Sequence, residues 1–211
     1  SQIPQNPRSM IDSWMVRQFQ PTLNKFALNW VPNWLRANAV TLIGFLIGLT
    51  VILLLWEQLY LHALAVILMN RFLDGLDGAI ARRDGISDLG GFLDISCDFI
   101  FYSAVVFGFA LADPDRNALA ASFLIFSFIG TGSSFLAYAI MASKRELRSI
   151  SHGTKGFFYL GGLTEGFETI LFMIVICLFP GWFVETAIFF GVLCWLTTLG
   201  RFTIAIQNLS D

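Results

Sequence analysis

The chain has few charged residues. Only 13% of its 211 positions are Asp, Glu, Lys or Arg, whereas 56% are hydrophobic and 22 residues are phenylalanine. Soluble domains contain about 25% charged residues. This shortage excludes an ordinary soluble domain and predicts a membrane protein.

Cysteine is also scarce, and the chain has no excess of positive charge. The three cysteines, Cys97, Cys177 and Cys194, stand in separate apolar stretches without a CxxC pair or a paired histidine. They therefore predict neither a zinc site nor a disulfide. The net charge of -2 gives no basic excess, so we expect no nucleic-acid partner.

Proline is absent from the interior of the apolar runs, which organise the whole chain. Residues 39–56 supply 18 uncharged residues, just enough to cross a bilayer as a helix. Pro114 and Pro180 fall between runs. We predict an all-α, polytopic membrane protein with a single membrane domain over residues 1–211. Its six expected transmembrane helices cover about 38–56, 59–82, 89–112, 117–142, 156–180 and 182–206.

Lysine and arginine concentrate on alternate connections. The first, third and fifth connections contain only Arg116. By the positive-inside rule, both termini and the even-numbered connections should be cytoplasmic. The basic residues on that side are Arg8, Arg17, Lys25, Arg36, Arg82, Arg83, Lys144, Arg145, Arg148 and Lys155.

The N-terminal segment 8–35 has apolar residues at roughly helical spacing, among them Trp14, Phe19 and Leu23, with Arg17 and Lys25 between them. This pattern predicts an amphipathic helix lying on the cytoplasmic leaflet. A helix packed on the protein's own cytoplasmic face fits the pattern equally well.

Four aspartates interrupt the apolar pattern where the second and third spans meet. Asp74 and Asp77 share one helix face, as do Asp94 and Asp98, because residues three or four apart lie on the same side of a helix. The short connection 83–88 should make the two helices antiparallel neighbours. We therefore expect the carboxylates to converge just inside the cytoplasmic interface.

These four charges need compensation. A carboxylate facing lipid costs about 2.5–3.5 kcal/mol, and like charges repel. Arg71, Arg82 and Arg83 can offset part of this, so a plain salt-bridge network is one interpretation. Hard divalent cations offset more, because carboxylate oxygens are their preferred ligands. We favour a metal site, since ion pairing alone does not need this spacing on two helices.

The stretch "DGLDGAIARRDGISDLGGFLDISCD" resembles the signature of the CDP-alcohol phosphotransferases, DxxDGxxAR followed by GxxxDxxxD. Seven residues separate Arg82 from Gly90, where eight are usual in that family. Six spans and an amphipathic N-terminal helix also fit the family, and the later segments look like a bacterial inner-membrane branch. The matching residues are Asp74, Asp77, Gly78, Ala81, Arg82, Gly90, Asp94 and Asp98.

The resemblance implies transfer of a phosphatidyl group from a CDP-linked lipid such as CDP-diacylglycerol to an acceptor alcohol, with release of CMP. It also implies a homodimer and two divalent cations, Mg²⁺ or Mn²⁺. By similarity, Asp74, Asp77 and Asp94 would hold the cations, and Asp98 would touch the second cation and act as general base. The nucleotide contacts implied in the same way are Asn38, Thr41, Gly78, Arg82 and Ser87.

The acceptor site is expected among basic residues. Arg201 stands inside the apolar sixth span, where an arginine normally faces a polar cavity. We predict that the acceptor is anionic and that Arg201 and Lys155 hold its phosphate. The alternative is that Arg201 forms a structural ion pair with Glu165 or Glu168. The full set of candidate acceptor residues is Lys144, Arg145, Arg148, Lys155 and Arg201.

Two other functions use membrane-embedded aspartates. An intramembrane prenyltransferase also binds a diphosphate through metal-held aspartates, but needs more spans. An ion or metal transporter tends to show paired repeats with broken helices, and this sequence shows neither.

The charge pattern yields a test of topology. In intact cells, an impermeant thiol reagent should label a cysteine introduced at position 115 or 116 and should miss cysteines at 83 and 150. The reverse pattern would contradict a cytoplasmic site.

Overall fold

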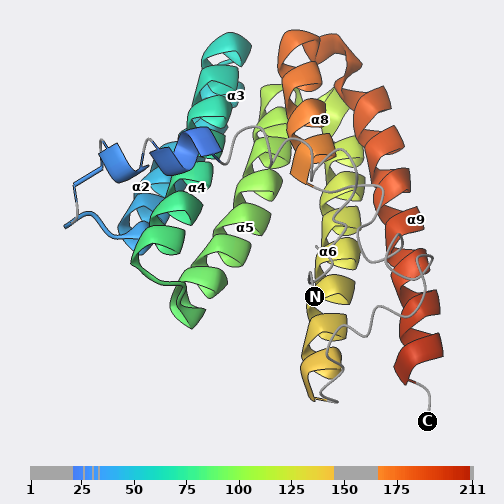
Figure 1. Ribbon diagram of the computed structural model, residues 1–211. Coiled ribbons are helices and arrows are strands. Elements are labelled where there is room, and N and C mark those ends of the chain that lie inside the picture. Colours follow the sequence, from blue (N-terminus) through green and yellow to red (C-terminus); the bar gives the residue numbers. More distant parts are fainter. Residues whose placement is uncertain (1–20, 26, 30, 33, 145–165, 210–211) are drawn as a thin grey trace.

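The computed structural model describes residues 21–144 and 166–209, apart from residues 26, 30 and 33. Their ordered elements are helical (Figure 1). Residues 21–25 and 27–29 are also helical, ahead of the first labelled element. The labelled elements are α2 (Ala37–Leu49), α3 (Val51–Trp56), α4 (Tyr60–Asp84), α5 (Asp88–Ala112), α6 (Pro114–Lys144), α8 (Gly166–Leu178), the 3-10 turn η1 (Pro180–Trp182) and α9 (Phe183–Leu209).

Four stretches are long and apolar enough to cross a membrane: Ala37–Trp56, Asp88–Ala112, Pro114–Lys144 and Pro180–Leu209. Helix α8 is apolar but has only 13 residues within the described chain. Helix α4 has 25 residues but carries charged residues from its middle onward, among them Arg71, Asp74 and Asp77. The prediction of an all-α, polytopic membrane protein is therefore confirmed.

Prolines mark helix starts. Pro114 is the first residue of α6 and Pro180 the first of η1. A first-turn position suits proline, because its missing N–H would have no partner within the helix. Between α5 and α6, only Asp113 lies outside the helices, so the connection between these two spans is one residue long.

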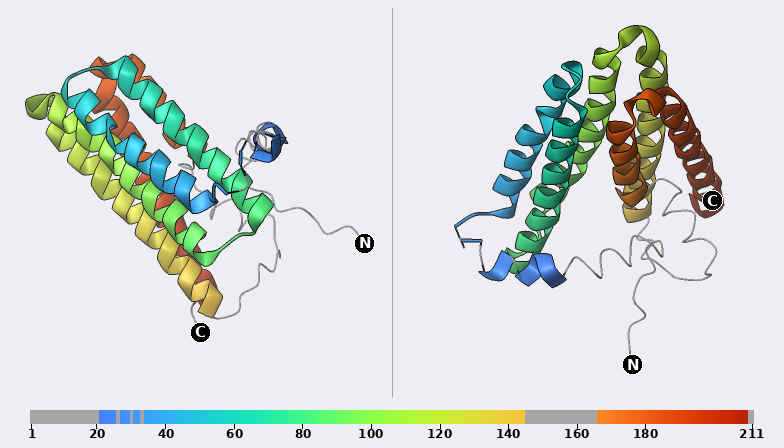
Figure 2. Two further views of the ribbon diagram at one scale, coloured as in Figure 1. Left: turned by 90° about the vertical axis from the view of Figure 1, so that its left-hand side faces the viewer. Right: turned by 90° about the horizontal axis from the view of Figure 1, so that it is seen from above.

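Helix α5 lies at the centre of the bundle. It packs against α2 and α3 on one side and against α6 on the other, and α6 pairs along α9. Viewed from above, α2, α4 and α5 form one group and α6, α8 and α9 the other (Figure 2). Helix α8 contacts α4 and so links the two groups.

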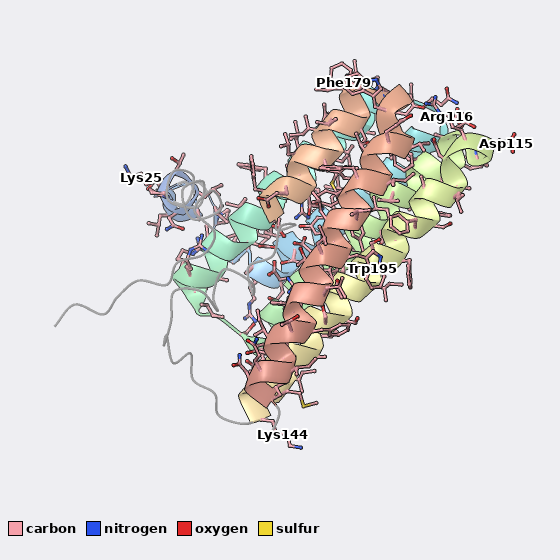
Figure 3. The ribbon with its side chains drawn as sticks, turned by 90° about the vertical axis from the view of Figure 1, so that its right-hand side faces the viewer. Lys25, Asp115, Arg116, Lys144, Phe179 and Trp195 are labelled. Atoms are coloured by element: carbon pink, nitrogen blue, oxygen red, sulfur yellow. The ribbon has the colours of Figure 1, made fainter. Side chains whose placement is uncertain are left out.

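The apolar core is built from aromatic rings at the end of the bundle opposite the α4–α5 connection. The rings of Phe109 and Phe183 stack with centroids 4.7 Å apart, and Tyr60 stacks on Phe109 at 5.7 Å. Phe101, Phe109 and Phe183 are fully buried. Figure 3 shows Asp115, Arg116 and Phe179 at this end and Lys144 at the other.

Helices α4 and α5 follow one another across a short connection and meet through side chains, among them Arg71 of α4 and Asp98 of α5. They diverge from Gly85–Ser87, and α2 packs against both of them. Gly85 has a φ of 110°, a left-handed conformation that glycine adopts without a steric penalty.

The N-terminal segment packs on the protein itself. Ala27 and Val31 are buried against Val40 of α2 and against Leu76 and Ile80 of α4. Arg83 donates hydrogen bonds to the Ala27 and Val31 carbonyls, both at 3.0 Å. Residues 8–20 of the predicted amphipathic helix lie outside the described part of the chain.

Gly108 permits a close approach of α3 and α5 in the core. A Cβ at this position would lie 2.7 Å from Leu55 Cδ1 and 3.4 Å from Ile52 Cα. Small residues allow membrane helices to approach in this way.

We expect Gly108→Ala to lower the unfolding temperature in detergent, because overpacking a core costs about 1–3 kcal/mol. The control is Gly166→Ala, where an added Cβ meets nothing within 4 Å. If both variants unfold at the same temperature, α3 and α5 do not pack closely at Gly108.

Candidate active site

Three aspartates come together between α4 and α5. One carboxylate oxygen from each of Asp74, Asp77 and Asp94 lies within 4.8 Å of the others. Asp77 is buried, Asp74 is half-buried and Asp94 is exposed. The set thus reaches from the interior to the surface.

The donor set fits a hard divalent cation. Ligand oxygens lie about 2.0–2.6 Å from Mg²⁺ or Ca²⁺, so oxygens sharing one ion are separated by about 3–5 Å. The three carboxylates satisfy this spacing with little movement. Their chemistry is all oxygen, which suits Mg²⁺, Mn²⁺ or Ca²⁺ better than softer metals.

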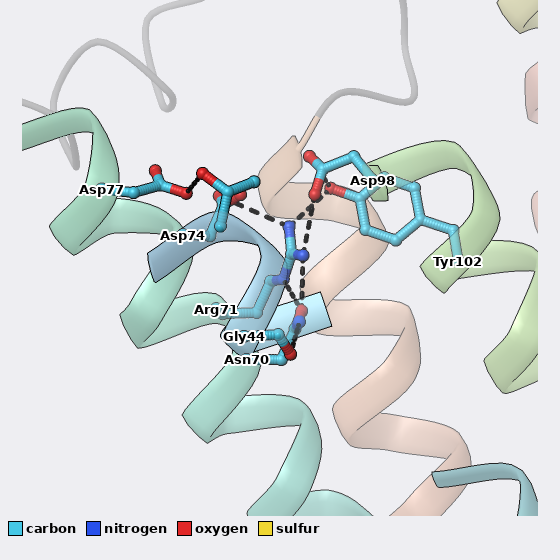
Figure 4. A network of polar contacts seen from close by, with 8 residues as sticks. Gly44, Asn70, Arg71, Asp74, Asp77, Asp98 and Tyr102 are labelled. Atoms are coloured by element: carbon cyan, nitrogen blue, oxygen red, sulfur yellow. Dashed lines mark hydrogen bonds and ion pairs between the residues drawn. The ribbon is translucent and has the colours of Figure 1, made fainter. Parts of the chain in front are cut away.

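Asp98 is not part of this group of three. Its Oδ1 accepts a hydrogen bond from Arg71 Nη2 at 2.8 Å, and its Oδ2 accepts one from the Tyr102 hydroxyl at 2.9 Å. Figure 4 shows the network, with Arg71 directed from α4 toward Asp98 and Tyr102. The four predicted aspartates therefore divide into three plus one.

Arg71 supplies the positive charge nearest to the aspartates. Besides its bond to Asp98, its Nη1 lies 3.6 Å from Asp74 Oδ2, and its side chain is only 10% exposed. Arg71 also donates to Asn70 Oδ1 and to the Tyr102 oxygen. A nearly buried cation among four carboxylates lowers the cost of their mutual repulsion.

Helix α2 contributes to the same cluster. The Thr41 hydroxyl bonds to Asp77 Oδ2, and the Ala37 carbonyl lies 3.1 Å from the same hydroxyl. Farther along α2, the Gly44 carbonyl accepts a bond from Asn70 Nδ2 at 2.9 Å. These contacts explain why α2 packs against α4 beside the aspartates.

An open pocket lies beside Asp77 and Asp94. Ser87 caps the start of α5 by accepting a bond from Gly90 N at 3.1 Å. All five residues expected to contact a nucleotide line this pocket. They are Asn38, Thr41, Gly78, Arg82 and Ser87.

The N-terminal segment reaches one wall of this pocket. Asn24 Oδ1 accepts hydrogen bonds from Arg82 Nε at 3.3 Å and from Nη2 at 3.1 Å. The side chain of Leu23 lies against Gly75, one residue from Asp74.

The expected acceptor residues are only partly described. Arg145, Arg148 and Lys155 lie outside the described residues, and Lys144 is exposed at the end of α6. Arg201 is buried and donates from Nη1 to the Thr131 carbonyl at 2.7 Å and to its hydroxyl at 2.8 Å. Lys144 is 13 residues from Thr131, or about 20 Å along the helix, so the structure does not bring Lys144 to Arg201.

Arg201 lies at the level of Asp98 in the bundle. A Cβ added at Gly132, which follows Thr131, would lie 2.7 Å from the Phe99 ring. Phe99 follows Asp98 on α5, so the Arg201–Thr131 contact and the fourth aspartate share one layer.

Tyr102 and Asn24 were not anticipated from the sequence. Tyr102 stands one helical turn after Asp98, and this i, i+4 spacing is a usable signal for a side-chain contact. No sequence pattern links Asn24 to Arg82, since the contact joins residues 58 positions apart.

Comparisons with known proteins agree with the signature. A profile described as CDP-alcohol phosphatidyltransferase matches residues 34–203. The chain is 50% identical to "Inner membrane protein YnjF" of Escherichia coli over 91% of this chain and 93% of that protein. It is 31% identical to "Archaetidylinositol phosphate synthase" of Pyrococcus horikoshii over 78% of this chain and 80% of that protein.

A eukaryotic relative shares a shorter region. The chain is 30% identical to "Cholinephosphotransferase 1" of mouse over 57% of this chain and 34% of the mouse protein. Together the matches set aside the prenyltransferase and transporter alternatives. The chain belongs to the CDP-alcohol phosphatidyltransferase family and is an enzyme of that family.

Proposed function

We propose that the enzyme transfers a phosphatidyl group from a CDP-linked lipid such as CDP-diacylglycerol to an acceptor alcohol, in phospholipid biosynthesis. The observation that supports this most is the shared wall of the pocket and the carboxylate cluster. Asp77 and Asp94 belong to both, so a nucleotide in the pocket would place its diphosphate beside the three carboxylates.

Asp74, Asp77 and Asp94 would hold two divalent cations, Mg²⁺ or Mn²⁺, with Asp98 approaching the second. Bound there, the cations would neutralise the diphosphate and stabilise the departing CMP. The Thr41 hydroxyl fixes the orientation of Asp77, and Gly78 leaves room for a phosphate near the backbone.

Asp98 would act as general base. The acceptor hydroxyl oxygen forms a bond to the phosphorus that carries the lipid, the bond from that phosphorus to the CMP oxygen breaks, and the hydroxyl proton passes to Asp98. Asp98 lies outside the group of three carboxylates, which suits a residue that must meet the acceptor.

We further propose six transmembrane helices, a cytoplasmic site and a homodimer. Residues 37–56 would form one span, and α4 and α8 would join the four long apolar spans. The relative from E. coli is named an inner membrane protein, which supports the same membrane here.

The acceptor is proposed to be anionic, held by Arg201 with Lys155, Lys144, Arg145 and Arg148 as the other candidates. A buried guanidinium in the layer of Asp98 supports this, because arginine suits bidentate phosphate binding. The archaeal relative is named a synthase of an inositol phosphate lipid, in line with a phosphorylated acceptor.

The direct test is CMP release. The purified protein, given CDP-diacylglycerol and a panel of alcohols, should release CMP only with Mg²⁺ or Mn²⁺ and should stop on chelation. Absence of CMP release with every alcohol, in protein that binds Mn²⁺, would contradict the proposed reaction.

Removing a carboxylate should remove metal affinity. Mutation of a residue that only supports a metal ligand lowers metal affinity about 10–100-fold. Asp74→Asn, Asp77→Asn and Asp94→Asn each remove a ligand itself, so we expect each to weaken Mn²⁺ binding by more than this. Calorimetry with Mn²⁺ measures this. The control is Asp115→Asn at the far end of the bundle, and equal affinities in all four variants would disprove the site.

Asp98→Asn should abolish turnover and leave CDP-lipid binding largely intact, because general-base catalysis contributes about 10²–10⁴-fold. Normal turnover would refute the general-base role. Loss of Mn²⁺ binding together with turnover would make Asp98 chiefly a ligand.

An anionic acceptor predicts a selective effect at Arg201. Arg201→Ala and Lys155→Ala should each raise KM for a phosphorylated alcohol by about 10-fold or more, since a charged hydrogen bond contributes about 1.5–3 kcal/mol. KM for a neutral alcohol should not change. Efficient use of a neutral alcohol with unaltered KM in both variants, and no use of a phosphorylated one, would contradict an anionic pocket.

A further inference from the structure

Both oxygens of the Asp98 carboxylate are engaged by neighbouring side chains. Arg71 Nη2 donates to Oδ1, and the Tyr102 hydroxyl donates to Oδ2. The third side of this triangle is also closed, because Arg71 Nη1 donates to the Tyr102 oxygen at 2.9 Å. Rotation of the carboxylate would break at least one of these bonds.

Arg71 is itself held firmly in place. Its Nε and Nη2 both donate to Asn70 Oδ1, and Asn70 is anchored through Nδ2 to the Gly44 carbonyl on α2. Its guanidinium lies 5.0 Å from the centre of the Phe101 ring and 5.1 Å from that of Tyr102. Asn70 is only 4% exposed, so the anchor is inside the protein.

The network joins three helices around one carboxylate. Arg71 and Asn70 come from α4, Asp98 and Tyr102 from α5, and the Gly44 carbonyl from α2 (Figure 4). In the proposed reaction Asp98 both approaches the second cation and receives the proton of the acceptor hydroxyl. The direction of its carboxylate therefore decides whether it can meet that hydroxyl, and without this network the carboxylate would be free to turn.

We propose that Arg71 and Tyr102 are positioning residues that fix Asp98 for proton transfer, an inference that rests on the proposed function. In this role they would act through Asp98, although Arg71 also lies 3.6 Å from Asp74. Both lie outside the matched signature, since Arg71 precedes it and Tyr102 follows it. The physical reason is precision: a displacement of about 1 Å at a reacting group can cost about 100-fold in rate.

Tyr102→Phe is the most selective change. It removes one hydroxyl and leaves the ring that packs beside Arg71. We expect kcat for CMP release to fall about 10–100-fold, with KM for the CDP-lipid and the Kd for Mn²⁺ changed less than about threefold. Arg71→Lys, which keeps the charge but not the planar fork, should retain more activity than Arg71→Gln.

The matched control is Tyr60→Phe, which removes a tyrosine hydroxyl from the start of α4 at the opposite end of the bundle. Its kcat should equal that of the wild type. Unfolding temperatures in detergent identify any variant that fails to fold. If both Arg71 variants fail to fold, Tyr102→Phe alone tests the positioning role.

The outcomes separate the two proposals. If the wild type turns over and Tyr102→Phe has normal kcat, the positioning role is wrong. If Mn²⁺ affinity falls in parallel with kcat, the two residues support the metal site instead, and the proposal is again overturned. If the wild type releases no CMP, the proposed reaction fails, and the positioning role fails with it.

Discussion

The ion pair between Arg71 and Asp98 is the interaction on which the site depends. Four carboxylates gathered in a membrane protein repel one another and resist removal from water. Arg71 balances part of that charge through its 2.8 Å ion pair with Asp98 and its contact with Asp74. One oxygen from each of Asp74, Asp77 and Asp94 lies close enough to share a cation.

The helix arrangement follows from the same constraint. Helices α4 and α5 meet through the Arg71–Asp98 ion pair beside their aspartates, and α2 packs against both. The Gly44 carbonyl and the Thr41 hydroxyl of α2 bond to Asn70 and Asp77. The divergence of α4 and α5 also leaves the pocket that their connection closes on one side.

Much of this site could be predicted from local sequence. The spacing of Asp74, Asp77, Asp94 and Asp98 fixes their helix faces, and the signature identifies the family. Of the pocket residues, Gly78, Arg82 and Ser87 lie within the signature stretch, whereas Asn38 and Thr41 stand at the start of the first span, outside it.

What the sequence could not supply were contacts between distant segments. Arg71 had several carboxylates within reach, and only the packed helices select Asp98, 27 positions away. The packing of α2 against both α4 and α5 was not predicted, because a short connection fixes the direction of two helices but not which third helix packs on them. The contact of Asn24 with Arg82 likewise depends on how the N-terminal segment crosses the end of α4.

The most direct measurement is the location of Mn²⁺ in crystals of the protein, using anomalous scattering. The account predicts an ion about 2.0–2.6 Å from oxygens of Asp74, Asp77 and Asp94, with Asp98 still bonded to Arg71 and Tyr102. An ion at that position ligated by Asp98 in place of one of the three, with Arg71 displaced, would contradict it.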